Sequence, residues 1–598
     1  MNKKKVFLRI LCLIISLSLL VFQGGCKKSN SGSNSSSGAD NGESTIISST
    51  IDSQGSESFD SGISQASQAS QASGNNTSTN TGSKTSSTAN TNGVDPFGKY
   101  NPSITLSFGR ESDDMVTDTL NKLGETIGDN RWTKLFSDTL GINIKYNWVA
   151  MGADGYATKL NLVITSGELP DICKVNSLQL NLLTAAGAIQ DLTSIYNTYA
   201  ADFTKKTLNI AGSDTLAAAT VNGKLMGLPE TVDPSVDSPM LWIRKDWLDN
   251  LGLAMPKNMT DLFNVIEKFT NNDPDKNGKN DTFGFTSYRG LWGTICGLEG
   301  FFAGYGSYPG LWLKKDGKLQ YGAIAPEAKN ALQALRDLYS NGYMPSDFAV
   351  YDSGACTQLL TSGKVGLEYG SHWNTIYPLN MSHSNDPKAN WVAIPVLSAL
   401  ATPAKTISTQ ATAGWYVVKK GVKNPEALVK MYNMFIEKNW GATQEWGKYY
   451  LVGAVEGVWK FSPVKPSVTN QNLADFLALD QARKTNNFSK LTGSALGIQK
   501  RLEANDWGWE KIYGAGGSMG VIEYSQNNNL YVKNEFVTAP TPTMISRLTT
   551  LNDMASTAYM GIIVGANPIN YFDAFVSDWK KAGGDQMTTE VNNWYKNK

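Results

Sequence analysis

The sequence predicts an α/β protein with mostly parallel sheets, preceded by a long polar N-terminal segment. Stretches with alternating apolar residues, such as residues 142–148, are interspersed with stretches that have helical spacing, such as residues 262–269. The chain has 598 residues, of which 41% are apolar, and this is enough for about two to four domains with their own cores. Residues 29–98, by contrast, consist mainly of Ser, Asn, Gly, Thr, Gln and Ala.

Charge and the rarity of cysteine and histidine argue against several classes of function. Lys and Arg total 53, and Asp and Glu also total 53, whereas a nucleic-acid-binding protein usually carries a basic surplus. The 5 cysteines are too few for a disulfide scaffold, and none forms a C-x-x-C pair. With only His372 and His383, the chain has neither a multi-histidine metal centre nor an HExxH protease motif.

The first 26 residues predict an export signal that ends in a lipidation site. Basic residues up to Arg9 precede an apolar run at residues 10–22, which is shorter than the about 20 residues of a membrane-spanning helix. Gly24, Gly25 and Cys26 then resemble the lipobox of bacterial lipoproteins, although Gln23 stands where that pattern usually has Leu. The resemblance implies removal of residues 1–25 and acylation of Cys26, for example with palmitate, on the outer face of the cell membrane. An ordinary secretory signal with an incidental Cys26 is the alternative.

Residues 26–99 predict a lipid anchor followed by a disordered tether. The segment includes the repeat SQASQASQAS at residues 64–73 and cannot bury enough apolar surface to offset its chain entropy. A flexible coil of about 70 residues has an end-to-end distance of about 45 Å, which would hold a folded body clear of a membrane. A low-complexity tail without a role fits the same composition.

The folded body is expected to begin near residue 100. Residues 103–108 predict a first strand, and residues 142–148 a second strand with Ile142 and Tyr146 on one face. Helical spacing follows Thr260, which we expect to be an N-cap, and recurs at residues 572–579 before a stop at Gly583-Gly584.

An ordered set of short motifs resembles the extracellular solute-binding proteins, which are the receptors of ABC-type sugar importers. These motifs are SGELPDI at 166–172, NGKLMGLP at 222–229, MLWIRKDWLDNLGL at 240–253, GKVGLE at 363–368 and EVNNWY at 590–595. Together they extend over almost all of residues 100–598. The sequence is most similar to the large Gram-positive oligosaccharide-binding lipoproteins and to the alginate-oligosaccharide-binding proteins.

The resemblance implies two α/β lobes that are joined by a hinge and close around a ligand. The first lobe would comprise residues 100–232 and 404–455, and the second residues 233–403 and 456–598. The implied function is that of a monomeric lipoprotein without enzymatic activity. It would capture an oligosaccharide outside the cell and deliver it to the permease subunits of an ABC transporter.

A calcium loop is predicted directly after the helix near residue 269. Oxygen ligands at relative positions 1, 3, 5, 7 and 9 match the first part of an EF-hand loop, with Gly278 at position 6. These ligands are Asp273, Asp275, Asn277, the carbonyl of Lys279, and Asp281. Position 12 is Gly284 instead of the usual Glu, and Thr282 stands where the resembled alginate-binding proteins have a carboxylate. A polar surface turn is the alternative.

Trp373 is the best single candidate for a ligand contact. In the resembled family an aromatic ring after the corresponding strand stacks on a sugar, whose apolar face complements an electron-rich indole. Trp373 follows such a strand in the sequence GSHWN, and its ring would be largely exposed in an open cleft. We expect its neighbour His372 to form hydrogen bonds and not to act as a catalyst. An aromatic residue at the edge of a core is the alternative for Trp373.

Residues 288–312 predict exposed aromatic platforms, because glycine-rich segments make poor cores. The aromatic residues of this segment are Tyr288, Trp292, Tyr305, Tyr308 and Trp312. Each one alone more often packs in a core than binds a ligand, but we expect at least one of the group to reach the ligand. By resemblance, polar residues on loops would line the cleft and bind sugar hydroxyls. These residues are Arg110, Glu111, Asn176, Glu230 and Arg244. Arg244 could instead be a salt-bridging strand residue.

A glycosidase and a surface adhesin are the alternative functions. A glycosidase needs two carboxylates about 5–10 Å apart. The candidates are Glu111, Asp113, Asp114, Glu230 and Glu299, for which the sequence gives no pairing signal. An adhesin would hold a polysaccharide without import.

Overall fold

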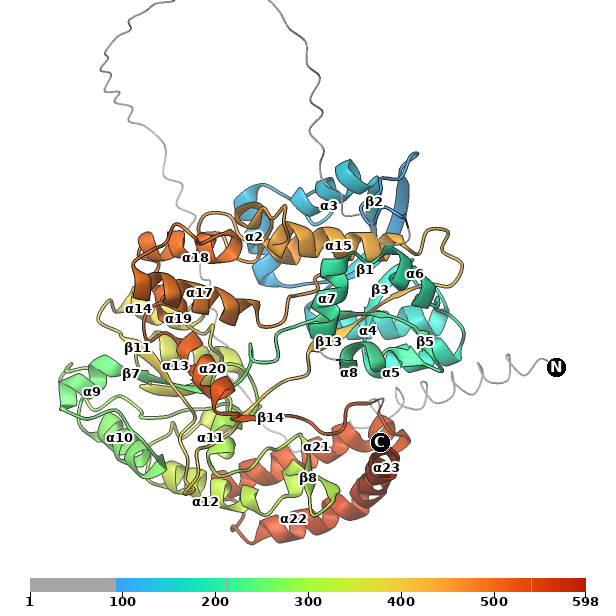
Figure 1. The fold of residues 1–598 in the computed structure, drawn as a ribbon. Helices are drawn as coiled ribbons and strands as arrows, with labels where there is room; N and C mark the ends of the chain where they lie inside the picture. The colour runs from blue at the N-terminus through green and yellow to red at the C-terminus, as the bar shows by residue number, and fades with distance from the viewer. Residues whose placement is uncertain (1–92, 211–212, 539) are drawn as a thin grey trace, which may run out of the picture. The chain divides into compact units, whose positions relative to one another are not determined.

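The computed structural model describes residues 93–598, except residues 211–212 and 539 (Figure 1). The predicted signal, the lipidation site Cys26 and most of the predicted tether lie outside the described residues. The end of that tether is part of the folded body, because Pro96 is buried and its carbonyl accepts a hydrogen bond of 3.0 Å from Asn433. The boundary predicted at residue 99 is therefore several residues too late. Within the described part, no helix is both long and apolar enough to span a membrane.

The first sheet contains both strands predicted near its start. Its order is β2-β1-β3-β13-β6. The bounds are β1 Ile104–Ser112, β2 Ile142–Met151, β3 Ile172–Val175, β6 Leu228–Thr231 and β13 Thr412–Val418. β1 is parallel to β2 and β3, whereas β13 is antiparallel to β3 and β6. Along β2, Tyr146 and Trp148 are half-buried while Lys145 and Asn147 are exposed, which confirms the predicted alternation.

Helices cover this sheet and form what we call the first core, around Phe108, Trp132 and Phe435. The helices are α2 Asp114–Leu123, α3 Arg131–Leu135, α4 Gly152–Ser166, α5 Ser177–Ala185, α6 Thr193–Tyr199, α7 Asp202–Ile210, α8 Ser213–Ala217 and α15 Ala427–Trp440. A short π-helix, η1 Phe136–Leu140, and the pair β4 Thr220–Val221 and β5 Lys224–Leu225 complete this part. Trp132 stacks on Phe435 with ring centroids 4.8 Å apart, which joins the start of the chain to α15.

The second sheet is wholly antiparallel, so the prediction of mostly parallel sheets is wrong for it. Its order is β10-β7-β11, with bounds β10 Leu367–Gly370, β7 Met240–Arg244 and β11 Trp391–Ile394. Every residue of β7 is buried, because both faces of the sheet are covered. The alternation of side chains places Leu241 and Ile243 on one face and Met240 and Trp242 on the other.

One face of the second sheet packs on the second core, which lies around Phe269, Phe301 and Tyr559. The other face of this sheet packs on the third core, which lies around Trp391 and Phe476. Elements that contribute to the second core include α9 Lys245–Leu251, α10 Met259–Asn271, α11 Glu299–Gly304, α12 Glu327–Ser340, α21 Pro542–Ile563, α22 Tyr571–Trp579, α23 Asp585–Lys596 and the hairpin β8 Trp312–Lys315 and β9 Lys318–Tyr321. Those of the third include α13 Ser353–Thr361, α14 Leu379–Asn385, α16 Trp446–Tyr449, α17 Gln471–Thr485, α18 Gly493–Glu503, α19 Trp507–Tyr513 and α20 Ser518–Asn527. The remaining short elements are η2 Gly322–Ile324, η3 Phe348–Val350, η4 Val458–Phe461, η5 Lys580–Gly584, and the parallel pair β12 Thr406–Ile407 and β14 Tyr531–Val532.

Of two predicted helix boundaries, one is wrong and one is confirmed. The N-cap of α10 is Asn258, whose side chain accepts from the backbone N–H of Asp261 at 2.9 Å, and Thr260 lies inside the helix. The helical run that begins with α22 ends at Gly583, as predicted, because this residue has φ of 127°, outside the helical region. A new helix, α23, begins directly afterwards at Asp585.

In the described part of the chain, three connections link the first core to the other two, and we call them the crossing segments: residues 232–239, 398–411 and 465–470. In addition, α16 lies where the first and third cores meet, with Tyr449 in the first and Trp446 in the third. Hydrogen bonds hold the crossing segments side by side. The N–H of Val232 donates to Ala411 at 3.1 Å, and the hydroxyl of Thr231 donates to the carbonyl of Ser467 at 2.6 Å. Several parallel connections of this kind are the expected basis for a hinge.

Candidate functional site

A cavity of about 450 Å³ lies where side chains of the first and third cores meet. Its size is within the range of small-molecule sites. The aromatic residues in its wall are Trp373, Tyr377, Trp440, Trp446, Tyr450, Trp459, Trp509 and Tyr513. Trp440 and Trp459 pack on the first core and Trp373 on the third, so a ligand here would touch both. We call this space the aromatic cavity.

Trp373 lies in the wall of the aromatic cavity and is firmly positioned. Its indole N–H donates to Asp237 at 3.1 Å, and the backbone N–H of Ser371 donates to Thr294 at 3.0 Å. A side chain at Gly370 would collide with Asn374, whose amide donates to Glu368 at 3.0 Å. The ring is half-buried, so the expectation of a largely exposed ring is wrong.

His372 also lines the cavity, but its ring is directed toward the protein. Nδ1 lies 2.9 Å from the carbonyl of Val236, and the residue is only 4% exposed. Burial lowers the pKa of this imidazole, so the ring is neutral at neutral pH. These contacts fit a hydrogen-bonding neighbour, as predicted.

Other parts of the cavity wall are built from rings that sequence reasoning missed. Tyr450 stacks between Trp446 and Trp459, with ring centroids 5.2 and 6.1 Å away. Trp509 meets Trp446 edge to face at 6.2 Å and stacks on Tyr513 at 5.4 Å. The signal was present in the sequence, because residues 440–459 combine aromatic residues with glycines as residues 288–312 do.

A few polar groups accompany these rings. Glu456 accepts from Arg501 at 2.5 Å and from the indole N–H of Trp509 at 2.9 Å. Asp475 accepts from Ser494 at 2.8 Å, and burial raises the pKa of its carboxyl to about 6. Lys460 forms an ion pair with Asp113 at 3.2 Å. The cavity therefore combines flat apolar faces with positioned hydrogen-bonding groups.

Arg110 and Glu111 line a second, small polar pocket at the carboxyl end of β1 and β3, and Glu230 lies beside it, paired with the lining residue Lys174. This pocket has a volume of about 20 Å³, and Lys174 and Lys465 also contribute to it. Its other lining residues include Tyr146, Tyr156, Tyr416, Ser462 and Pro463. Lys174 forms an ion pair with Glu230 at 3.2 Å and lies 3.8 Å from Glu111. We call this space the polar pocket.

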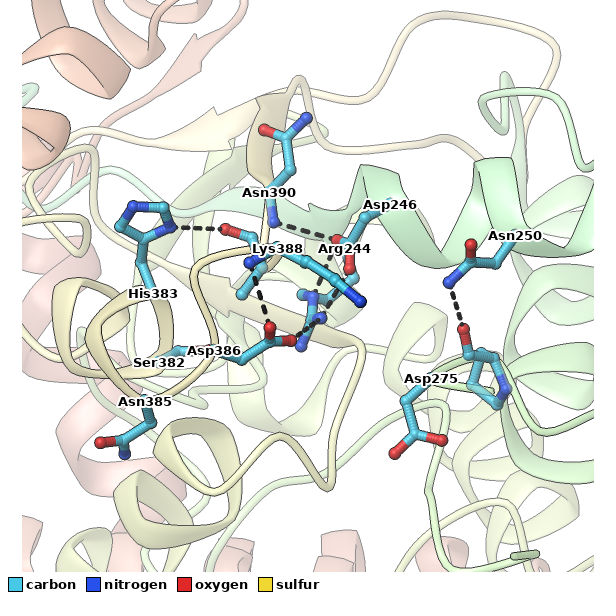
Figure 2. Close-up of polar contacts among 12 residues, drawn as sticks. Arg244, Asp246, Asn250, Asp275, Ser382, His383, Asn385, Asp386, Lys388 and Asn390 are labelled. Atoms are coloured by element: carbon cyan, nitrogen blue, oxygen red, sulfur yellow. Dashed lines mark hydrogen bonds and ion pairs between the residues drawn. The ribbon is translucent and has the colours of Figure 1, made fainter. Parts of the chain in front are cut away.

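Arg244 and Asn176 are engaged in local structure. Figure 2 shows the guanidinium of Arg244 between Asp246 and Asp386, with ion pairs of 2.6 and 3.1 Å. Arg244 is 2% exposed and lies over the ring of Trp247, so the salt-bridging interpretation is the one that the geometry supports. The side chain of Asn176 caps α5 and accepts from the backbone N–H of Gln179 at 2.9 Å.

The predicted exposed platforms in residues 288–312 are wrong. Tyr308 and Trp312 are buried in the second core, and Trp292 and Tyr305 are half-buried against it. Trp292 packs edge to face on Phe302 with centroids 5.4 Å apart. Tyr288 packs against the third core. The glycines here allow close approach of large rings, which is how a glycine-rich segment can still form a core.

The predicted calcium loop follows α10 and has the tight geometry of such loops. Both carboxylate oxygens of Asp273 accept backbone N–H groups, from Asn277 at 3.0 Å and Gly278 at 2.9 Å. The amide of Asn277 donates to Asp275 at 2.8 Å and to Asp281 at 3.3 Å. Asn250 ties the loop to α9 through the carbonyl of Pro274 at 2.8 Å (Figure 2).

The side chains of this loop provide oxygen, which is what calcium prefers. Burial raises the pKa of Asp275, and the neighbouring carboxyl of Asp273 raises it further, as expected where carboxylates converge. In this arrangement, however, the amide nitrogen of Asn277 lies between the carboxylates, and Asp281 pairs with Lys364 at 2.5 Å. Over the described residues, no group of three or more acidic, cysteine or histidine side chains is close enough to hold a metal ion. Calcium would thus require Asn277 to turn its amide oxygen inward.

The carboxylates considered for a glycosidase are mostly engaged elsewhere. Glu230 pairs with Lys174 and Asp113 with Lys460, while Glu299 accepts the N–H of Gly293 at 2.8 Å. Burial raises the pKa of Glu299 to about 7. Glu111 lines the polar pocket and not the aromatic cavity.

Comparison with known proteins gives a consistent picture. Residues 117–442 match the model of a family described as bacterial extracellular solute-binding protein. The polygalacturonan/rhamnogalacturonan-binding protein YtcQ of Bacillus subtilis is 26% identical over 73% of this chain and 83% of its own length. Lipoprotein LipO of the same organism is 25% identical over 76% of this chain and 86% of its own length.

A solved structure shows the same fold. It is an EF-hand mutant of the Streptococcus pneumoniae ABC-transporter substrate-binding protein FusA in complex with fructo-nystose. It superimposes with a TM-score of 0.56 and 19% identity, covering 83% of this chain and 99% of FusA. This likeness confirms the α/β fold with two lobes that the sequence predicted.

Proposed function

The chain belongs to the bacterial extracellular solute-binding proteins, and on this basis we propose that it captures an oligosaccharide outside the cell and delivers it to an ABC transporter permease. The observation that supports a sugar ligand is the aromatic cavity. Its wall contains eight Trp and Tyr side chains together with Glu456, Lys460 and Asp475. Sugars present apolar faces and polar edges, so such a wall complements them better than it does a purely apolar ligand.

Closure of the lobes would follow from the position of the cavity. Trp459 belongs to the first core and Trp373 to the third, and the crossing segments connect the two sides. A ligand that contacts both sides stabilises the closed state more than the open one, and only such a difference can shift the equilibrium. The permease would then recognise the closed, loaded form.

We favour a binding protein over an enzyme. Glu456 is held by Arg501 and Trp509, and Asp475 by Ser494, so both carboxylates of the cavity have partners in the protein. A surface adhesin that holds polysaccharide without import is the second candidate, and a glycosidase is the third.

Attachment to the outer face of the cell membrane through Cys26 is part of the proposal. It rests on the lipobox-like sequence and is in keeping with a relative that is named as a lipoprotein. Labelling cells with a radioactive fatty acid should label this protein, and a Cys26→Ser variant should be released into the medium. Labelling of the variant would contradict the assignment.

A structural calcium ion in residues 273–281 is also proposed. The residues that would hold it are Asp273, Asp275, Asn277, the carbonyl of Lys279, and Asp281. A divalent cation would offset the repulsion between the converging carboxylates and fix the loop that follows α10.

Calorimetric titration with a panel of neutral and acidic oligosaccharides tests the main proposal. We expect at least one to bind at micromolar or tighter affinity, and the recovered ligand to be chemically unchanged. Hydrolysed ligand would indicate an enzyme. A lack of binding over the whole panel, together with tight binding of peptides, would show that the proposed ligand class is wrong. Uptake of the bound sugar by cells with and without the gene separates an importer from an adhesin.

A further inference from the structure

The polar pocket contains more positive than negative charge. Three cations, Arg110, Lys174 and Lys465, face two carboxylates, Glu111 and Glu230, so the net surplus is one positive charge. Lys174 pairs with Glu230 at 3.2 Å and lies 3.8 Å from Glu111, and within the described residues neither Arg110 nor Lys465 has a carboxylate within 4 Å. Such a surplus in a partly enclosed space attracts an anion from outside.

Arg110 has unused hydrogen-bonding capacity. Its terminal nitrogens donate to neutral oxygens, the hydroxyl of Tyr146 at 3.1 Å and the carbonyls of Phe461 at 2.9 Å and of Lys460. Its Nε is buried and has no partner among the described residues, although the residue is only 6% exposed. A buried N–H without a partner destabilises the protein, and a guanidinium edge matches the geometry of a carboxylate.

Lys465 is the second unpaired cation. It is half-buried, and over the described residues its ammonium has neither a hydrogen bond nor an ion pair within 4 Å. Burial, which the charge of Glu230 only partly offsets, lowers the pKa of Lys465 to about 8. The ammonium is therefore still charged at neutral pH, and a bound anion would stabilise that charge.

The polar pocket adjoins the aromatic cavity along a single stretch of chain. Trp459 and Lys460 line the cavity, and Ser462 and Pro463 line the pocket. Lys460 and Ser462 are two residues apart, so their Cα atoms lie at most about 7 Å from each other, and a sugar chain stacked in the cavity can place the next unit over the pocket. The carboxyl ends of β1 and β3 are also where open α/β sheets usually bind ligands.

We infer that the polar pocket receives a carboxylate of the bound oligosaccharide, which therefore contains uronic-acid units. Its volume of about 20 Å³ accommodates one water-sized atom, such as a carboxylate oxygen. The inference rests on the proposed function and narrows its ligand class to acidic sugars.

The test compares oligogalacturonides with the same oligosaccharides after methyl esterification, which removes the charge and keeps the sugar. We expect the free acids to bind about tenfold tighter or better at low salt, and the difference to shrink as salt is added. Lys465→Met and Lys465→Gln should abolish most of this difference, and Lys465→Arg should retain it. Lys581→Met, an equal charge change at an exposed site, should leave the difference intact.

Each outcome separates this inference from the proposed function. Equal affinity for acids and esters would overturn the inference while sugar binding stands. Binding of acetate or free galacturonate as tight as that of the oligosaccharides would overturn it as well, because the pocket would then be a small-anion site. Failure to bind any oligosaccharide, acidic or neutral, would overturn the proposed function itself.

Discussion

Replacement of Trp373 by Ala should weaken ligand binding about thirtyfold and destabilise the ligand-free protein moderately. The ring is half-buried before ligand arrives. If a stacked sugar covers the remaining surface, about 80 Å², burial at about 25 cal/mol/Å² contributes about 2 kcal/mol to binding. At about 1.4 kcal/mol per tenfold change, this corresponds to roughly thirtyfold.

The effect on stability is of similar size. The part of the ring that is already buried contributes about 2 kcal/mol or more, and the hydrogen bond to Asp237 at 3.1 Å about 1 kcal/mol in addition. Calorimetry should report the loss of affinity, and thermal unfolding of the ligand-free protein should report a drop of a few degrees. Trp373→Phe keeps a stacking ring but loses the indole N–H, so it should retain most of the affinity.

Trp594 provides a matched control. It is also half-buried, packs edge to face on Phe536 at 5.0 Å and lies outside the aromatic cavity. Trp594→Ala should lower the melting temperature as Trp373→Ala does and leave affinity within about twofold. Unchanged affinity in Trp373→Ala with an equal loss of stability would refute the reasoning, because Trp373 would then be only a packing residue.

Three further predictions concern other parts of the molecule. Chelator should lower the melting temperature if Asp273, Asp275 and Asp281 hold calcium, because an ion bound only to the native state stabilises it; identical melting curves and no calcium by elemental analysis would contradict this. Arg244→Met should lower the free energy of unfolding by about 1–3 kcal/mol, because Asp246 and Asp386 lose their ion-pair partner. Ligand affinity should stay the same. A loss of affinity without a loss of stability would show that Arg244 contacts the ligand after all. Burial raises the pKa of Glu368 from 4.5 to about 7, so this carboxyl favours folding most when protonated, and its contribution to stability declines as pH rises from about 4.5 to about 7. Glu368→Gln should flatten that decline in melting temperature, and an unchanged pH profile would show that Glu368 is not its source.

Local patterns in the sequence predicted those helices and strands that have one buried and one exposed side, whatever elements they pack against. The alternation in β2 and the spacing in α10 depend on one exposed and one buried side, and both elements were found. The direction of the strands in the second sheet was missed, because β7 is buried on both faces and its run of apolar residues does not report its neighbours.

The site was predictable only in part for a similar reason. Trp373 could be placed by its position after a strand, but composition alone could not separate a core from a binding wall. Residues 288–312 and residues 440–459 are both rich in glycine and aromatic residues, yet Tyr308 packs in the second core and Trp459 lines the aromatic cavity. The difference arises from which distant segments cover each stretch. Nor did the sequence indicate the Cys296–Cys356 disulfide, which joins two segments 60 residues apart.

The position of β13 between β3 and β6 has a consequence for how the polypeptide matures. β6 ends at Thr231 and β13 begins at Thr412, so 180 intervening residues are synthesised before the first sheet can be completed. Until these residues have followed, β3 and β6 lack a shared neighbour and present open strand edges. The N-terminal third of the chain therefore cannot reach its native state on its own, and a nascent chain that pauses in this interval exposes those edges to aggregation or to a chaperone.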